Sequence, residues 1–157
     1  MIAPETPGTA GRHLRRLRRE EGQALVEFAL VLPVLLMIVT GVTSFGLVFY
    51  KYVTLTDAVR VGARTLALQR GNSDPCTSAA NQTVASAVNV GLTNSELTFS
   101  YNGAPFYTNG SCSGSGASWN QGDSVTVQAS IPYSLSIFGL ITVHSGTLTA
   151  RATDAVE

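Results

Sequence analysis

The chain has 157 residues, of which 45% are hydrophobic and only 13% are charged, and its ten basic residues balance its ten acidic residues. A net charge of zero argues against a nucleic-acid-binding protein or a polybasic surface protein. The length allows one modest domain together with an anchor.

Charge is distributed unevenly along the chain. Residues 1–11, MIAPETPGTAG, have no periodic apolar pattern and are interpreted as a disordered tail. Five arginines follow between positions 12 and 19. From residue 23 onward, five basic residues face seven acidic ones, which gives this part a net charge of −2. The basic residues are therefore concentrated immediately before the apolar run that comes next.

Residues 24–50 contain a single charged residue, Glu27, and as a helix they would extend about 40 Å, enough to cross a bilayer. The arginines before this segment and the lone Lys51 after it predict a cytoplasmic N-terminus and an exported C-terminal part. Tyr50 and Tyr52 are typical of a membrane interface. A cleaved secretory signal is the alternative, but the apolar run is too long and no A-x-A site closes it.

Glu27 lies inside this apolar segment, where a charge costs roughly 2.5–3.5 kcal/mol on insertion scales. The residue is therefore a candidate for a function. The alternative is that its carboxylate reaches the cytoplasmic headgroups, because it follows Glu21 by only six positions. Pro33, in the same segment, predicts a kink or a loosened helical turn.

The helical period continues beyond the apolar segment to about Arg70, with Gly71 as the stop. The predicted apolar face consists of Leu55, Ala58, Val59, Gly62, Ala63 and Leu66, and the polar face carries Asp57, Arg60 and Arg64. A second, short helix is predicted over residues 78–90. Its expected apolar face consists of Ala80, Val84, Ala87 and Val88, and Gly91 ends it.

Residues 96–101, 124–131 and 140–156 alternate apolar and polar side chains and predict antiparallel strands. Pro105 and Pro132 are expected at strand ends or edges. Residues 102–122 are rich in glycine, serine and asparagine and predict a long loop. Packing beneath this loop is favoured for Trp119 over the alternative, a role in binding. The predicted fold class is α+β: a long N-terminal transmembrane and amphipathic helix, followed by a small head with a short helix and an antiparallel sheet.

Two cysteines, Cys76 and Cys112, lie in the part predicted to be exported. A disulfide is favoured there over two free thiols or a metal site. It would contribute about 3–4 kcal/mol in the chain-entropy model. The two histidines, His13 and His144, are not accompanied by a nucleophile motif, a phosphate loop or a metal-binding spacing, so we expect neither catalysis nor a cofactor.

The sequence GQALVE, residues 22–27, resembles the prepilin processing site, in which a membrane peptidase cuts after glycine and leaves glutamate as the fifth mature residue. GQALVEFALVLPVLLMIVTGVTSFG, with the later DAVRVGARTLAL, is similar to the TadE-like proteins of the tight-adherence (Flp) pilus system, which are minor pilins or pseudopilins. The resemblance covers about residues 20–70. Pro33 falls earlier than the proline of many type IV pilins, which favours this family over a major pilin.

The resemblance implies a leader of residues 1–22 removed between Gly22 and Gln23, a transmembrane helix over 23–50, an amphipathic extension over 51–71 and an exported head over 72–157. It implies that Glu27, Phe28 and Pro33 act in helix docking, with Glu27 neutralising the freed amino terminus of a neighbouring subunit. The implied partners are a prepilin peptidase, other pilins, the pilus-assembly machinery and membrane lipid. The implied location is the inner membrane or an extracellular pilus. The alternative is an uncleaved single-pass membrane protein whose head binds a ligand or an envelope partner.

Overall fold

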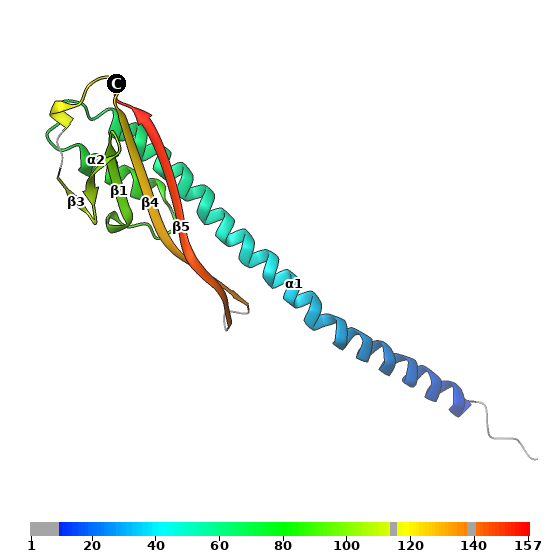
Figure 1. Cartoon of the computed structure of the whole chain (residues 1–157). Helices are drawn as coiled ribbons and strands as arrows, with labels where there is room; N and C mark the ends of the chain where they lie inside the picture. The colour runs from blue at the N-terminus through cyan, green and yellow to red at the C-terminus, as the bar shows by residue number, and fades with distance from the viewer. Residues whose placement is uncertain (1–9, 114–115, 138–140) are drawn as a thin grey trace, which may run out of the picture. The chain divides into compact units, whose positions relative to one another are not determined.

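The computed structural model describes residues 10–113, 116–137 and 141–157, so most of the predicted N-terminal tail lies outside the described residues. The chain divides into two compact units, Met1–Val42 and Thr43–Glu157, which are described separately below. One helix, α1 (Ala10–Ala67), contributes to both units (Figure 1). The predicted membrane segment and its amphipathic extension therefore belong to a single helix.

In the N-terminal unit, the helical backbone of α1 continues without a break through Pro33. The stretch Gly22–Ala67 is long and apolar enough to cross a membrane, judged by length and composition. The described side chains from residue 22 to residue 42 are exposed, except for the half-buried Thr40. The apolar surface of this stretch is therefore largely accessible.

In the C-terminal unit, the last turns of α1 supply one side of the hydrophobic core. The six residues predicted for the apolar face, Leu55, Ala58, Val59, Gly62, Ala63 and Leu66, are all buried. On the polar face, Arg60 forms an exposed ion pair with Asp57 at 3.7 Å. The helix ends at Ala67, slightly before the predicted Arg70.

Helix α2 (Pro75–Ser86) begins and ends earlier than predicted. Asp74 caps it by accepting hydrogen bonds from the backbone N–H groups of Cys76 and Thr77, both at 3.1 Å, and Pro75 occupies a favoured first-turn position. Because the helix ends at Ser86, Val88 falls outside it and is 59% exposed rather than part of the apolar face.

A glycine of α1 allows a residue of α2 to approach closely. A Cβ atom at Gly62 would lie 2.0 Å from Thr83 Oγ1, so no larger residue fits there without movement. Thr83 is fully buried, and its hydroxyl donates to the carbonyl of Ala79 at 2.6 Å. The absence of a side chain at position 62 thus sets the distance between the two helices.

The strands form one antiparallel sheet in the order β3-β2-β1-β4-β5. Their bounds are β1 (Leu97–Tyr101), β2 (Ala104–Thr108), β3 (Ser111–Cys112), β4 (Ser124–Ile137) and β5 (Ile141–Ala155). Short 3₁₀ turns, η1 (Asn94–Glu96) and η2 (Gly116–Ser118), precede β1 and β4. The predicted α+β class is correct, and the three predicted strands correspond to β1, β4 and β5.

The prediction of a loop over residues 102–122 is wrong, because β2 and β3 lie within it. Asn102 and Gly103 join β1 to β2 with φ angles of 46° and 84°, and Asn109 and Gly110 join β2 to β3 with φ angles of 51° and 82°. Two consecutive residues with positive φ are the geometry of a tight hairpin turn, for which Asn-Gly is the favoured sequence. The glycine and asparagine content that suggested a loop therefore specifies two hairpins.

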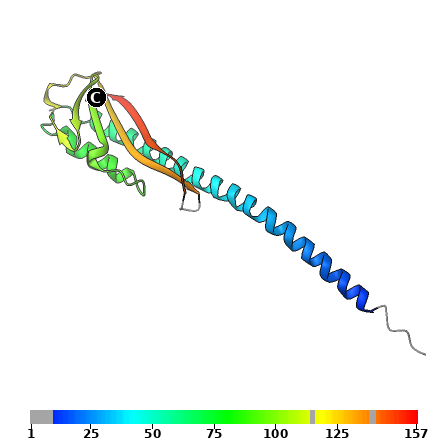
Figure 2. The same ribbon diagram turned by 60° about the horizontal axis from the view of Figure 1, so that its bottom comes forward.

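One face of the sheet is apolar and closes the core of the C-terminal unit. Its buried members include Leu97, Phe99, Tyr107, Val125, Val127, Ala129, Ile131 and Ala150. The opposite face carries hydroxyl groups, with Thr126 and Thr153 oxygens 2.9 Å apart across the strands. This alternation of apolar and polar side chains places the sheet over the core-facing part of α1 (Figures 1 and 2).

The β4–β5 hairpin is longer than the rest of the sheet. Strand β1 pairs with β4 only between Val125 and Ala129, whereas β4 and β5 pair along their whole length. Pro132 lies in β4 beyond the last β1 partner, at an open edge as predicted. The next pair across the hairpin is Tyr133 and Gly146. The ring of Tyr133 covers Gly146, and a Cβ atom added at Gly146 would lie 3.0 Å from Cε1 of that ring.

Candidate functional site

The residues predicted for processing and docking lie on an exposed stretch of α1 in the N-terminal unit. Gly22 and Gln23 are exposed, and the helix is continuous across the bond between them. The Gln23 amide donates a hydrogen bond from Nε2 to Glu27 Oε1 at 3.1 Å, as residues four apart on a helix face one another. The structure therefore brings together the predicted new N-terminal residue and the predicted acidic residue within one chain.

Phe28 and Pro33 continue the same exposed apolar surface. Phe28 is 63% exposed, and Pro33 is placed within the helix, where its ring nitrogen has no hydrogen to donate to the carbonyl of Ala29. Further along, the Thr40 hydroxyl donates to the carbonyl of Leu36 at 2.7 Å, so this polar side chain is satisfied by its own helix. The surface can pack against lipid or other apolar helices without leaving Thr40 unpaired.

The predicted disulfide is present in the C-terminal unit and joins Cys76 on α2 to Cys112 on β3, with Cα atoms 6.0 Å apart. Asp74 lies close to it, and the ligand atoms of the three residues are within 4.8 Å of one another. This is not a metal site, because the two sulfur atoms are bonded to each other. Hydrogen bonds from Thr77 and Cys76 hold the pKa of the Asp74 carboxyl below its usual value, which suits its role as a helix cap.

A polar and aromatic cluster lies where β1 meets the chain before β4. The Tyr101 hydroxyl donates to Asp123 Oδ2, and the backbone N–H of Asn120 donates to the same oxygen at 3.0 Å. The hydrogen bond from Tyr101 lowers the pKa of Asp123, and the same bond raises the pKa of Tyr101. The indole of Trp119 stacks on Tyr101 with ring centroids 5.3 Å apart and is only 7% exposed.

The predicted packing of Trp119 beneath the residues around it is confirmed, but the sequence does not predict its partners. Tyr101 and Asp123 are 22 residues apart, and no short-range pattern connects a strand tyrosine with a turn aspartate. The lone tryptophan in a glycine-rich stretch is the only signal for this cluster. Its hydrogen bonds connect Tyr101 at the end of β1 to Asn120 and Asp123 before β4.

Comparison with known proteins bears on the helix alone. Residues 22–64 match the model of the family described as TadE-like protein. Over this segment the chain is similar to that family. The matched TadE-like residues begin at Gly22 and end on the buried turns of α1, so they include Gln23, Glu27, Phe28 and Pro33. No curated protein and no solved structure matches the chain.

Proposed function

We propose that this TadE-like chain is a minor pilin or pseudopilin that takes part in assembly of a tight-adherence (Flp) pilus. The observation that carries the proposal is the match over residues 22–64, which falls on a helix long and apolar enough to span a membrane. Since the family is associated with this pilus system, the chain's partners are pilus-assembly components and other pilin-like helices.

Processing between Gly22 and Gln23 is part of the proposal. Gly22 is exposed, and the matched segment begins at that residue, which supports a boundary there. The continuous helix across this bond means that a membrane peptidase would have to unwind about a turn of α1 to reach it. Cleavage would also remove the arginine-rich piece and leave an apolar helix with a single new positive charge at its N-terminus.

The head is proposed to act in recognition rather than catalysis. The described His144 is exposed on β5, with its ring centroid 6.1 Å from that of Tyr133. His144→Ala is therefore expected to leave piliation unchanged.

The proposed positions of the parts follow from the charge pattern, with the N-terminus in the cytoplasm, α1 in the inner membrane and the C-terminal unit exported.

Mass spectrometry of the protein from its native cells tests the proposal. Cells with the prepilin peptidase should yield a chain that begins at Gln23, and cells without the peptidase should yield the longer chain. A longer chain in both strains would support the alternative, an uncleaved single-pass protein whose head binds an envelope partner. Gly22→Leu, which keeps the apolar helix and removes the glycine, is a suitable control and should remain uncleaved even in cells that have the peptidase.

A further inference from the structure

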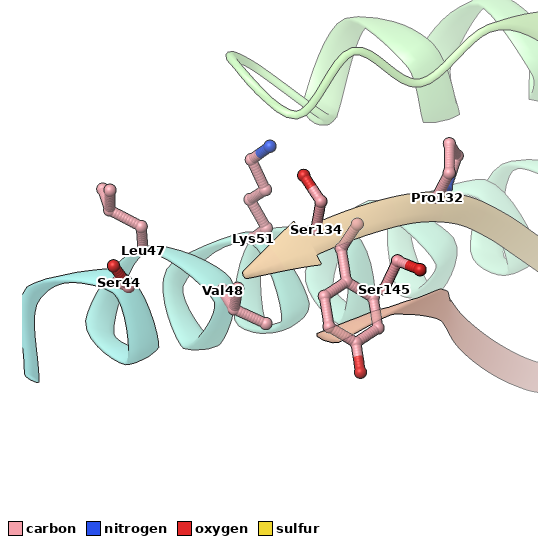
Figure 3. Close-up of a pocket in the computed structure, with 8 residues that line it drawn as sticks. Ser44, Leu47, Val48, Lys51, Pro132, Ser134 and Ser145 are labelled. Carbon is pink, nitrogen blue, oxygen red and sulfur yellow. The ribbon is translucent and has the colours of Figure 1, made fainter. Parts of the chain in front are cut away.

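A pocket of about 590 Å³ lies within the C-terminal unit, between α1 and the long β4–β5 hairpin (Figure 3). Leu47, Val48 and Lys51 line it from α1, and Ser134 and Ser145 line it from β4 and β5. In Figure 3, Lys51 and Ser134 point to the same side of the pocket. The volume is within the range of about 300–1,000 Å³ that is typical of small-ligand sites.

The lining combines one cation, several hydroxyl groups and an apolar wall. None of the eight lining residues is acidic, and Lys51 is their only basic residue. Among the described residues, no carboxylate lies within ion-pair distance of its ammonium group. Ser134, Ser145 and Tyr133 add hydroxyl groups, whereas Leu47 and Val48 provide apolar surface. The pocket is therefore complementary to a molecule with an anionic group joined to an apolar chain.

The position of the pocket along α1 matches a membrane surface. Between Glu27 and Lys51 the sequence has no charged residue, and the helix rises about 36 Å over that distance. A hydrocarbon core is about 30 Å thick, so Lys51 would lie at the level of the lipid headgroups, with Tyr50 and Tyr52 beside it. The sequence IFGLITV, residues 137–143, also has no charge.

We propose that this pocket binds the headgroup phosphate of an anionic phospholipid, whose acyl chain runs along Leu47 and Val48. The Lys51 ammonium pairs with the phosphate, and the hydroxyl groups of Ser134 and Ser145 donate hydrogen bonds to it. The inference rests on the membrane anchoring in the proposed function, but not on pilus assembly. A bound lipid would connect the β4–β5 hairpin to the helix turn that leaves the membrane.

Native mass spectrometry of the full chain, released from detergent micelles, tests this assignment. Phosphatidylglycerol and phosphatidylcholine with identical acyl chains are offered in equal amounts, and inorganic phosphate is offered separately. We expect phosphatidylglycerol to be retained preferentially and inorganic phosphate not to bind. Lys51→Gln should lower the preference for phosphatidylglycerol about fivefold, the effect of about one basic residue near an anionic surface. Lys51→Arg should retain the preference.

Two further variants distinguish lipid binding in the pocket from general electrostatic attraction of anionic lipid to α1. Arg64→Gln removes an exposed charge from α1 outside the pocket and should leave the lipid preference unchanged. Ser145→Leu fills the pocket without altering charge and should reduce phosphatidylglycerol retention as strongly as Lys51→Gln. Trp119 fluorescence establishes that each variant is folded.

Several results would overturn the lipid site: equal retention of both lipids, equal effects of Lys51→Gln and Arg64→Gln, unchanged binding by Ser145→Leu, or binding of phosphate alone. Fractionation of the host cells separates this failure from that of the proposed function. A chain absent from the membrane fraction contradicts the anchoring itself. A membrane-bound chain without lipid preference contradicts only the pocket assignment.

Discussion

Glu27 is a carboxylate on a helix surface formed otherwise by exposed apolar side chains. Within the chain its described partner is the neutral amide of Gln23, which satisfies one oxygen but leaves the charge without an opposite charge. In a bilayer this arrangement is unfavourable, and a cation from a neighbouring helix would relieve it. The freed amino group of a processed subunit is such a cation, so charge pairing would favour docked helices over separate ones.

We therefore expect Glu27→Gln to be processed at Gly22 but to assemble poorly. Glutamine keeps the size of the side chain and removes the charge, so the number of pili per cell should fall roughly tenfold or more, given what an unpaired buried charge costs. Electron microscopy counts the pili, and mass spectrometry checks the N-terminus. Asp57→Asn, a neutral substitution on the exposed face of the same helix, is the matched control. Normal piliation by Glu27→Gln would contradict charge-guided docking.

Asp123 has a different role, because its hydrogen bonds join β1 to the chain before β4. Its pKa is lowered in the folded chain, so it stabilises the fold above about pH 4, and this contribution is lost as the pH falls through the lowered pKa. The raised pKa of Tyr101 gives the opposite pH dependence. The Tyr101 hydroxyl stabilises the fold below about pH 10, and this stabilisation is lost as the pH rises through the raised pKa.

Asp123→Asn should therefore lower the melting temperature at pH 7 and have a smaller effect at an acid pH below the lowered pKa, where the wild-type carboxylate is also protonated. Trp119 is the only tryptophan and stacks on Tyr101, so its fluorescence follows unfolding at the site of the change. The full chain is measured in detergent, with Glu157→Gln as a control for the loss of one negative charge. An equal drop at both pH values would show that ionisation of Asp123 does not stabilise the fold.

The contact between α1 and α2 depends on the absence of a side chain at Gly62. An added methyl group would overlap the Thr83 hydroxyl, which is held by its bond to Ala79. Gly62→Ala should therefore lower the free energy of unfolding by about 1–3 kcal/mol, although alanine favours a helix by up to about 1 kcal/mol over glycine. Urea unfolding followed by Trp119 fluorescence measures the change.

Removing the overlapping oxygen should rescue the variant, because Thr83→Ala takes away the atom that the new methyl group meets. The double variant is expected to be more stable than the sum of the two single effects predicts. Gly46→Ala is the matched control, since a Cβ there meets nothing within 4 Å. Additive effects of Gly62→Ala and Thr83→Ala would show that the helices can separate without cost at this point.

Elements with a strong local pattern could be predicted from the sequence, and elements defined by turns or caps were harder to place. The stripe from Leu55 to Leu66 and the alternation of β1, β4 and β5 are periodic, so burial follows from spacing alone. The start of α2 depends on Asp74 and Pro75, a capping signal outside the periodic pattern. The two Asn-Gly turns required attention to backbone conformation rather than to composition.

The candidate functional residues also differ in how far the sequence could predict their neighbours. The neighbourhood of Gln23 and Glu27 is local, because residues four apart share a helix face, and it can be anticipated from spacing. The pocket is not local: it joins Lys51 to Ser134 and Ser145, which are far apart in the sequence. Only the register of β4 with β5 and the packing of the hairpin against α1 bring these residues together.

At the scale of the whole molecule, the C-terminal unit carries a small core and one covalent link. Cys76 and Cys112 are 36 residues apart, and their bond ties the start of α2 to the outermost strand, β3. Strand β3 pairs with β2 at only two positions, Cys112 and Ser111, so its hydrogen bonds alone hold it weakly. The disulfide thus fixes the edge of the sheet that has the fewest backbone contacts.

Replacing both cysteines with serine should lower the stability of the C-terminal unit by about 4 kcal/mol in the chain-entropy model, since the unfolded chain regains the freedom of a long loop. If the free energy of unfolding falls by about 2 kcal/mol for each M of urea, the midpoint of unfolding should fall by about 2 M. Trp119 fluorescence of the full chain in detergent measures it. Wild-type protein treated with reductant should match the double variant, whereas reductant should not affect the variant itself. A midpoint within about 0.3 M of the oxidised wild type would mean that packing around Gly62 and Trp119, rather than the covalent link, supplies most of the stability.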